Sequence, residues 1–284
     1  MAVQNNKTIF FLAGLPRSGS TLLMNILAQN PSIHATPTSG ILDMLVSVRN
    51  HWNQNEAFRA MDRKLSEDIK KRVLVGMLQN YFAHVDQPIC IDKNRYWTEY
   101  LELADVLVGG RNNVKVLITV RDLRDVLASF ERLYRKTSAL SQLSQEAATA
   151  LKFKTATGRL EVFADDAQPV GRAYNAIRDA VTRGWLDCMH FIEYEHLTRY
   201  PEDTLSGIYD FLGTEPYTHN IDHVEQVTVE DDFVYGFKDL HIIRPKVEPQ
   251  DTQWQATYDE TVFNTPVWKN IDNAAQFWRA YKSN

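Results

Sequence analysis

The string GLPRSGST, residues 14–21, is the part of the chain whose residue types and spacing most clearly indicate chemistry. Gly14 and Gly19 let the backbone turn its N–H groups toward an anion, and a helix beginning at Ser20 would add its partial positive charge. The glycines have the spacing of a P-loop, and Thr21 stands where that loop has its Ser or Thr. Ser20 replaces the P-loop lysine, so the positive charge comes from Arg17. The pattern predicts a phosphate cradle and disfavours an ordinary ATPase; the alternative is a Gly/Ser-rich turn.

A second candidate lies in VKVLITVRDLRDVLASFERLYR, where Arg121 follows a buried strand and Ser129 lies on the next helix. Open α/β sheets bind ligands at the carboxyl ends of their strands, which is where Arg121 would stand. Ser129 shares a helix face with Asp125 and Arg132. Asp122 is interpreted as the helix N-cap, with Asp125 completing a capping box. The alternatives are a surface salt bridge of Arg121 with these aspartates and an ordinary surface serine at 129.

The string LPRSGSTLL resembles the 5′-phosphosulfate loop of the sulfotransferases that use 3′-phosphoadenosine-5′-phosphosulfate (PAPS), closest to the tyrosylprotein and bacterial carbohydrate branches. In that family an Arg at a strand end and a Ser eight residues later bind the 3′-phosphate, which matches Arg121 and Ser129. YEHLTRYPEDTLSGIYDFLG, residues 194–213, is similar to the family's late strand-helix unit. Ile91-Asp92-Lys93 is similar to a lysine-containing strand end of the tyrosylprotein branch. The matches extend over about residues 8–213.

The resemblance implies transfer of a sulfuryl group from PAPS, as co-substrate, to a hydroxyl of a carbohydrate, peptide or small metabolite, with no metal. Lys93 would stabilise the leaving group, unless it is a solvated loop lysine. Arg17 and the loop amides would hold the phosphosulfate. The donor site implied by the resemblance comprises Arg17, Ser18, Gly19, Ser20, Thr21, Arg121, Ser129 and Tyr194, the last of which is alternatively a core aromatic. Two other functions remain open: a P-loop nucleotide kinase and a non-catalytic PAPS- or nucleotide-binding module.

The general base that must take the acceptor proton is not evident. The tyrosylprotein and several carbohydrate branches have a Glu just after the second strand, where this chain has Thr36-Pro37-Thr38-Ser39-Gly40. The candidates elsewhere are His34, which a strand-end interpretation puts near the loop, His51, Asp43, Glu56 and His241. His241 ranks first because DLHIIRPK joins it to Arg244 and Lys246 in an extension that could fold over the cleft.

Elements that position these residues follow from the pattern of apolar runs. We expect strands at KTIFFLAG (7–14), 32–36, QPICID (87–92), VKVLITV (114–120) and CMHFIEYEHL (188–197). We expect helices at 20–29, 41–49, 66–82, 96–108, 123–135, 170–183, 201–212 and near 271–281, while 137–165 is hard to assign. Strands that alternate with helices imply a parallel sheet. The prediction is one three-layer α/β, P-loop-like domain over 1–284, with a core at about 7–213 and an irregular C-terminal extension, 214–284.

Composition and charge limit the classes of binding partner and the cellular compartment that we expect for this chain. The 284 residues carry 31 basic and 36 acidic side chains, a net charge of −5, which argues against nucleic-acid binding. An anionic ligand must therefore meet a local positive pocket. Two cysteines make no disulfide framework, and no apolar run approaches the ~20 residues of a membrane span, so a cytoplasmic location is expected. The acceptor pocket is expected in segments 40–85 and 137–165; the acceptor's identity and the oligomeric state stay open.

Overall fold

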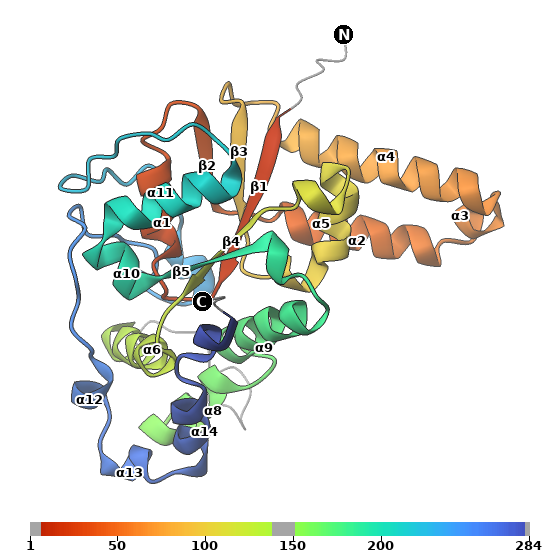
Figure 1. Cartoon of the computed structure of the whole chain (residues 1–284). Helices are drawn as coiled ribbons and strands as arrows, with labels where there is room; N and C mark the ends of the chain where they lie inside the picture. Colours follow the sequence, from red (N-terminus) through yellow and green to blue (C-terminus); the bar gives the residue numbers. More distant parts are fainter. Residues whose placement is uncertain (1–6, 138–150, 282–284) are drawn as a thin grey trace.

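The computed structural model describes residues 7–137 and 151–281. Its centre is a five-stranded parallel sheet with the strand order β2-β3-β1-β4-β5 (Figure 1). The strands are β1 (Thr8–Gly14), β2 (Ile33–Thr38), β3 (Ile89–Lys93), β4 (Val116–Val120) and β5 (Met189–Glu193). All five lie in segments where the sequence predicts strands, and the predicted α/β class with a parallel sheet is confirmed.

Helices connect the strands and cover both faces of the sheet. Those in the first half of the chain are α1 (Ser20–Leu27), α2 (Ile41–Gln54), α3 (Glu56–Ala60), α4 (Arg63–Tyr81), η1 (Trp97–Tyr100), α5 (Leu101–Val108), η2 (Arg111–Asn113) and α6 (Leu123–Thr137). After residue 150 come α8 (Ala156–Ala164), α9 (Pro169–Thr182), η3 (Leu186–Cys188), α10 (Tyr194–Arg199) and α11 (Pro201–Leu212). The extension contains η4 (Asp232–Tyr235), α12 (Trp254–Thr257), α13 (Glu260–Phe263), α14 (Pro266–Ala274) and η5 (Phe277–Tyr281).

The layers follow from the alternation of side chains along β1. Phe10 and Leu12 face one side, where they join a buried cluster with residues of α1 and α11. Ile9 and Phe11 face the other side and pack with residues of α2, α4, α5, α6 and α9. Figure 1 shows α1 and α11 on one face of the sheet and α2, α4 and α5 on the other. Because successive side chains of a strand point to opposite faces, a strand apolar throughout needs cover on both sides, and this gives three layers.

The parallel register brings the predicted site residues to one edge of the sheet. Thr38 pairs with Lys93, the last residue of β3, and Gly14 pairs with Thr119 near the end of β4. Arg121 follows β4 directly. The loop after β1, Lys93 and Arg121 therefore share the carboxyl edge of the sheet, where open α/β sheets bind their ligands.

The C-terminal extension packs on this core instead of standing apart from it. Its buried residues belong to the same two clusters as the sheet: Phe237, Leu240, Tyr258, Trp268 and Trp278 on one side, Val224 and Val247 on the other. Asp125 holds the extension in place, since its carboxylate accepts from the backbone N–H groups of Gln253 (2.7 Å) and Trp254 (3.1 Å). The predicted capping box is therefore wrong for Asp125, whereas Asp122 does cap α6 by accepting from the N–H of Arg124 (3.0 Å).

Several predicted elements differ in extent: α2 ends at Gln54 and not at residue 49, α4 begins at Arg63 and not at residue 66, and β2 ends at Thr38 and not at residue 36. The strand predicted over 188–197 ends at Glu193, because Glu193 pairs with Val120, the last residue of β4, and the chain turns into α10. The helix predicted over 96–108 begins with the 3-10 turn η1, in which Trp97 donates to the buried Asp92 (2.7 Å). The final helix is interrupted at Ala275, whose carbonyl accepts from Leu123 N–H (2.9 Å). Of the unassigned segment 137–165, residues 138–150 lie outside the described residues, and α8 occupies much of the remainder.

Candidate active site

The loop between β1 and α1 has the strained backbone that an anion cradle requires. Gly14 has φ +135°, and an added Cβ would meet the carbonyl oxygen of Thr119. Gly19 has φ +86°, and an added Cβ there would come within 2.6 Å of the Tyr194 ring. Arg17 also has a left-handed backbone, with φ 60°. Only glycine tolerates the first two environments, and the turn points the amino end of α1 into the cavity described below.

Ser18 and Tyr194 shape the loop from opposite sides. The buried Ser18 hydroxyl lies within hydrogen-bond distance of the Leu15 carbonyl oxygen (2.5 Å) and the Thr119 hydroxyl (2.8 Å). It is thereby turned into the sheet, so only its backbone N–H remains for a bound phosphate. Tyr194, half-buried at the start of α10, lies against Gly19 and lines the cavity. It therefore belongs to the wall of the site and not to the central core.

Arg17 reaches across the site. Its Nε donates to the hydroxyl of Ser129 on α6 (3.1 Å), and its Nη1 donates to the carbonyl oxygen of Leu240 in the extension. Burial lowers the pKa of the Arg17 guanidinium, and the neighbouring Arg121 lowers it further. Two guanidinium groups so close together form a site favourable for an anion between them.

Arg121 has a buried N–H donor with no acceptor among the residues that the structure describes. The residue is 8% exposed, and its Nε is buried without a hydrogen-bond partner. The nearest carboxylate oxygen, on Glu195, lies 3.7 Å from Nε, and the guanidinium carbon lies 4.5 Å from the centre of the Tyr194 ring. A buried donor without a partner costs free energy, about 1–3 kcal/mol. The guanidinium is thus built to receive an anionic ligand, and Ser129 lies beside it along the cavity wall.

A cavity of about 480 Å³ joins these groups. Its size is that of pockets that hold one small ligand. Besides the loop, Arg121 and Ser129, its walls include the cationic side chains Arg95, Arg132, Arg244 and Lys246. Arg132 donates to the Thr257 hydroxyl (3.0 Å), and burial followed by Arg121 lowers its pKa. This positive wall supplies the local pocket that the negative net charge of the chain requires.

Lys93 ends β3 beside the loop. Its Nζ is 3.0 Å from Oε1 of Glu230 and 3.4 Å from the hydroxyl of Thr21. The residue is 5% exposed, and burial lowers the pKa of the ammonium group while Glu230 opposes that shift. Lys93 is therefore an ion-paired cation facing the loop hydroxyl rather than a solvated loop lysine.

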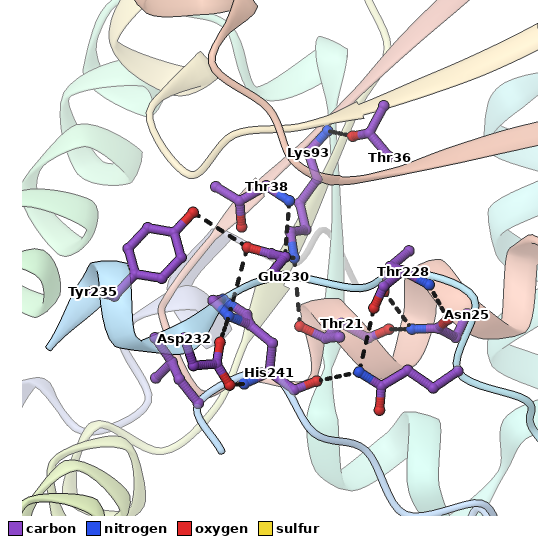
Figure 2. A network of polar contacts seen from close by, with 12 residues as sticks. Thr21, Asn25, Thr36, Thr38, Lys93, Thr228, Glu230, Asp232, Tyr235 and His241 are labelled. Atoms are coloured by element: carbon purple, nitrogen blue, oxygen red, sulfur yellow. Dashed lines mark hydrogen bonds and ion pairs between the residues drawn. The ribbon is translucent and has the colours of Figure 1, made fainter. Parts of the chain in front are cut away.

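His241 lies on the other side of the same ion pair (Figure 2). Its Nδ1 is 2.6 Å from Oδ1 of Asp232, and its backbone N–H donates to Oδ2 of the same carboxylate (3.0 Å). Nδ1 therefore carries the proton, and Nε2 has no hydrogen-bond partner among the described residues. Burial lowers the pKa of the imidazole, the Asp232 hydrogen bond opposes this, and Lys93 lowers it further. A neutral imidazole with a free Nε2 is suited to accept a proton.

A small recess of about 30 Å³ brings the two groups together. It is lined by Lys93, His241, Arg95, Ser20 and Thr38, and thus has room for a group of about the size of a water molecule. The recess lies at the carboxyl edge of β1 and β3, next to the loop. A hydroxyl placed there would be within the reach of both a cation and a base.

The side-chain amides of the buried Asn25 and the half-buried Gln226 hold the segment that carries His241. Asn25 on α1 accepts with Oδ1 from Val227 N–H (2.6 Å) and Thr228 N–H (3.0 Å) and donates to the Thr228 hydroxyl (2.8 Å). Gln226 donates to the carbonyl oxygen of His241 (3.0 Å) and accepts from the N–H of Ile243 (3.1 Å). The segment is thereby tied to the helix that follows the loop.

Sequence reasoning missed several residues of the site: Asn25, Arg95, Gln226, Glu230, Asp232 and Tyr235. Glu230 and Asp232 were hard to predict as site residues, because the string VEDDFVY, residues 229–235, has no periodic pattern and is typical of a solvent-exposed acidic segment. The structure nevertheless puts a carboxylate at the end of β2, where the sequence has none: Oε1 of Glu230 accepts from the N–H of Thr38 (2.9 Å).

Of the five candidate bases, His241 alone lines either cavity. The strand-end placement of His34 was wrong: it pairs with Cys90 near the amino ends of β2 and β3 and lies 6.0 Å from the His84 ring. Asp43 and His51 are exposed on α2, and Glu56 is exposed at the start of α3. The residues that the structure brings together are Arg17, Thr21, Lys93, Arg121, Ser129, Tyr194 and His241.

Within the described ranges, 7–137 and 151–281, no group of three or more His, Cys, Asp or Glu side chains could hold a metal ion. No helix within these ranges has the length and apolar character needed to cross a membrane.

Comparison with known proteins gives consistent matches. A family model described as "Sulfotransferase family" matches residues 10–219. Among curated proteins, a protein-tyrosine sulfotransferase of Drosophila melanogaster is 22% identical over 221 residues, which cover 77% of this chain and 40% of the fly protein. Protein-tyrosine sulfotransferase A of Caenorhabditis elegans is 22% identical over 228 residues, 78% of this chain and 53% of the worm protein. The chain thus spans about half or less of the length of these relatives.

Solved structures share the fold. The sulfotransferase domain from the curacin biosynthetic pathway aligns with a TM-score of 0.56 at 18% identity, over 98% of this chain and 99% of that domain. The sulfotransferase domain from the Synechococcus PCC 7002 olefin synthase aligns with a TM-score of 0.55 at 18% identity, over 98% and 97%. The alignments include the C-terminal extension, so this segment is part of a shared architecture.

Proposed function

Since the chain belongs to the sulfotransferase family, we propose that it transfers a sulfuryl group from PAPS to a hydroxyl acceptor. One observation carries the proposal: Arg121, whose Nε has no hydrogen-bond partner among the described residues, lines one cavity together with Ser129, the loop and His241, and the small recess lined by Lys93 and His241 adjoins the same loop. A sulfuryl donor with a phosphate on each side of its ribose matches the two phosphate-binding features, Arg121 with Ser129 and the loop. The residues present thus fit PAPS as a bound substrate.

Arg121 and Ser129 would hold the 3′-phosphate, and the amides of the loop would hold the phosphosulfate. Arg17 links the two ends, because its backbone belongs to the loop and its guanidinium reaches Ser129. Tyr194 supports Gly19 and Arg121 and offers the nucleoside an aromatic surface. Arg244 and Lys246 add positive charge at the rim.

In the chemical step the acceptor hydroxyl gives its proton to Nε2 of His241 while its oxygen attacks the sulfur. The bond from sulfur to the bridging oxygen of the 5′-phosphate breaks, and its electron pair stays on that oxygen. Lys93, beside Thr21, compensates the charge that develops there. Asp232 holds the imidazole with Nε2 free and stabilises the imidazolium that forms. This His–Asp pair supports a catalytic role over the non-catalytic alternative, since it offers a base although the chain has no carboxylate directly after β2.

The acceptor is a proposal at the level of class: a hydroxyl on a carbohydrate, a peptide or a small metabolite. The name of the curated relatives adds tyrosine-containing peptides to the acceptors that should be tried first. We also propose a reducing compartment such as the cytoplasm, supported by Cys90 and Cys188, which are both buried and unpaired.

The experiment is an acceptor screen with PAPS labelled on sulfur, run beside calorimetric titrations with 3′,5′-diphosphoadenosine and AMP. The proposal expects labelled product with at least one hydroxyl class and tighter binding of the diphosphate. Magnesium-dependent turnover of ATP without binding of PAPS would instead establish a kinase. Tight binding of the diphosphate with no transfer to any acceptor would indicate a binding module.

A further inference from the structure

Glu230 stands between the cation and the base of the proposed site, although it comes from a distant part of the chain. We propose that Glu230 is a positioning residue that separates the Lys93 ammonium from the imidazolium of His241 and thereby keeps His241 able to accept a proton. The inference rests on the proposed function for its meaning in turnover. Its geometry and its test need neither an acceptor nor a completed reaction.

Both carboxylate oxygens of Glu230 are held in place (Figure 2). Oε1 accepts from Nζ of Lys93 (3.0 Å) and from the N–H of Thr38 (2.9 Å). Oε2 accepts from the hydroxyl of Tyr235 (3.3 Å) and lies 3.6 Å from Nδ1 of His241. The side chain is only 6% exposed. Because strands β2 and β3 and the extension all fix it, the carboxylate bridges Lys93 and His241 in one defined orientation.

Glu230 is poorly suited to be the base itself. Burial would raise the pKa of its carboxyl group, but Lys93 and the Thr38 donors outweigh burial, so the pKa is lowered. Its oxygens are already engaged, whereas Nε2 of His241 has no partner among the described residues. The role that remains is electrostatic and geometric.

The need for such a group follows from the charges. When His241 takes the acceptor proton, an imidazolium forms next to an ammonium group, and like charges at short distance in a buried site disfavour one another. His241 faces Asp232, Glu230 and Tyr235 from its own segment, Lys93 and Arg95 from the end of β3, and the loop cation Arg17. Lys93 lowers the pKa of the imidazole, and Glu230 and Asp232 raise it. Removal of Glu230 leaves Asp232 alone against the cations.

The sign of the effect is therefore defined. Glu230→Gln keeps the size of the side chain and removes its charge, so the pKa of His241 falls and the population of imidazolium at a given pH decreases. A decrease of about one pKa unit, which is about tenfold in that population, is the expected size for a single buried charge at this distance. In turnover the acidic limb of the pH–rate profile moves to lower pH while the plateau rate falls.

The test is an NMR titration of the His241 ring proton in protein saturated with 3′,5′-diphosphoadenosine, with the signal assigned by its loss in His241→Asn. Glu230→Gln is expected to lower the pKa of His241 by about one unit. Glu225→Gln, an exposed carboxylate on the same segment, is the matched control and is expected to leave it unchanged. An unchanged pKa in folded Glu230→Gln would overturn the inference, as would an equal shift in the control.

Glu230→Asp covers the possibility that the glutamine variant does not fold. It keeps the charge but shortens the reach to Lys93, so the inference expects the pKa of His241 to stay within about half a unit of wild type. A large fall of the pKa in this variant would contradict a charge-based role. If the protein does not bind the diphosphate at all, the proposed function fails, while the same titration without nucleotide still tests whether Glu230 governs His241.

Discussion

Replacement of Arg121 by alanine tests whether this residue binds the 3′-phosphate of the sulfuryl donor. Arg121 is buried and its Nε has no hydrogen-bond partner among the described residues, so a phosphate has to displace only the weak pairing of that nitrogen with Glu195. A hydrogen bond to a charged group contributes about 1.5–3 kcal/mol. We take about 2 kcal/mol, because a bound phosphate replaces the weak pairing of Arg121 with Glu195, which lies 3.7 Å away. Arg121→Ala should therefore weaken 3′,5′-diphosphoadenosine about 30-fold.

Plain AMP lacks the 3′-phosphate and should lose less than about threefold in the same variant. Isothermal titration of both nucleotides into wild type, Arg121→Ala and Arg121→Lys measures the difference directly. The lysine variant keeps the charge without the fork of donors and should fall between the other two. Arg59→Ala, an exposed arginine on α3, is the control for loss of a positive charge far from the site.

Equal losses for the two nucleotides would refute this reasoning. The structure offers the physical reason for that outcome, since the guanidinium of Arg121 lies over Tyr194 and Tyr194 packs against Gly19 of the loop. An effect transmitted along this path would disturb the 5′ end of both ligands. Thermal unfolding of each variant separates either result from a loss of folded protein.

Four further outcomes are expected. Arg17→Ala should raise the activation free energy of sulfuryl transfer by about 2–4 kcal/mol, measured from kcat/KM, while a circular dichroism melt should show that the fold persists. His241→Ala should cut kcat by about 10²–10⁴-fold. Because burial lowers the imidazole pKa and only the neutral ring accepts a proton, the wild-type rate should fall only at a pH below the ordinary range of histidine, and the variant should lose this limb. Asn25→Ala strands the N–H groups of residues 227 and 228 and should lower the free energy of unfolding by about 2 kcal/mol or more, with the exposed Asn50→Ala as control. Transfer should survive EDTA; loss of activity that magnesium restores would contradict the metal-free mechanism.

The strands and the loop that would bind the sulfuryl donor could be predicted, because short apolar runs and a glycine-rich turn identify them locally in the sequence. Two buried strands end in a glycine loop and in Arg121, and the parallel register then brings those ends to one edge whatever lies between them. Lys93 follows the same rule at the end of β3. Where the sequence failed, tertiary contacts decided: β5 ends where β4 stops offering partners, and Asp125 serves the extension instead of its own helix.

The acid–base half of the site could not be predicted in this way. Glu230, Asp232 and His241 lie in the first part of the extension, residues 214–253, where the short turn η4 is the only helical element, and no periodicity relates them to the sheet. Their placement depends on Asn25, which reads in the sequence as an ordinary polar residue inside a helix. The only usable indication was an absence. The sequence has an anion-binding loop and a lysine at a strand end but no carboxylate after β2, so another part of the chain had to supply the acid–base group.

Different parts of the chain hold the cations and the base of the proposed site. The sheet edge fixes the cations, because moving Arg121 or Lys93 would require a new register for β4 or β3. The extension supplies the carboxylates and the base, and two amides hold this segment, Gln226 from within the extension and Asn25 from α1. In the proposed mechanism, donor binding and proton removal therefore depend on parts of the chain with different structural constraints. Glu230 is the group through which they meet, since one of its oxygens faces the sheet's lysine and the other faces the extension's histidine.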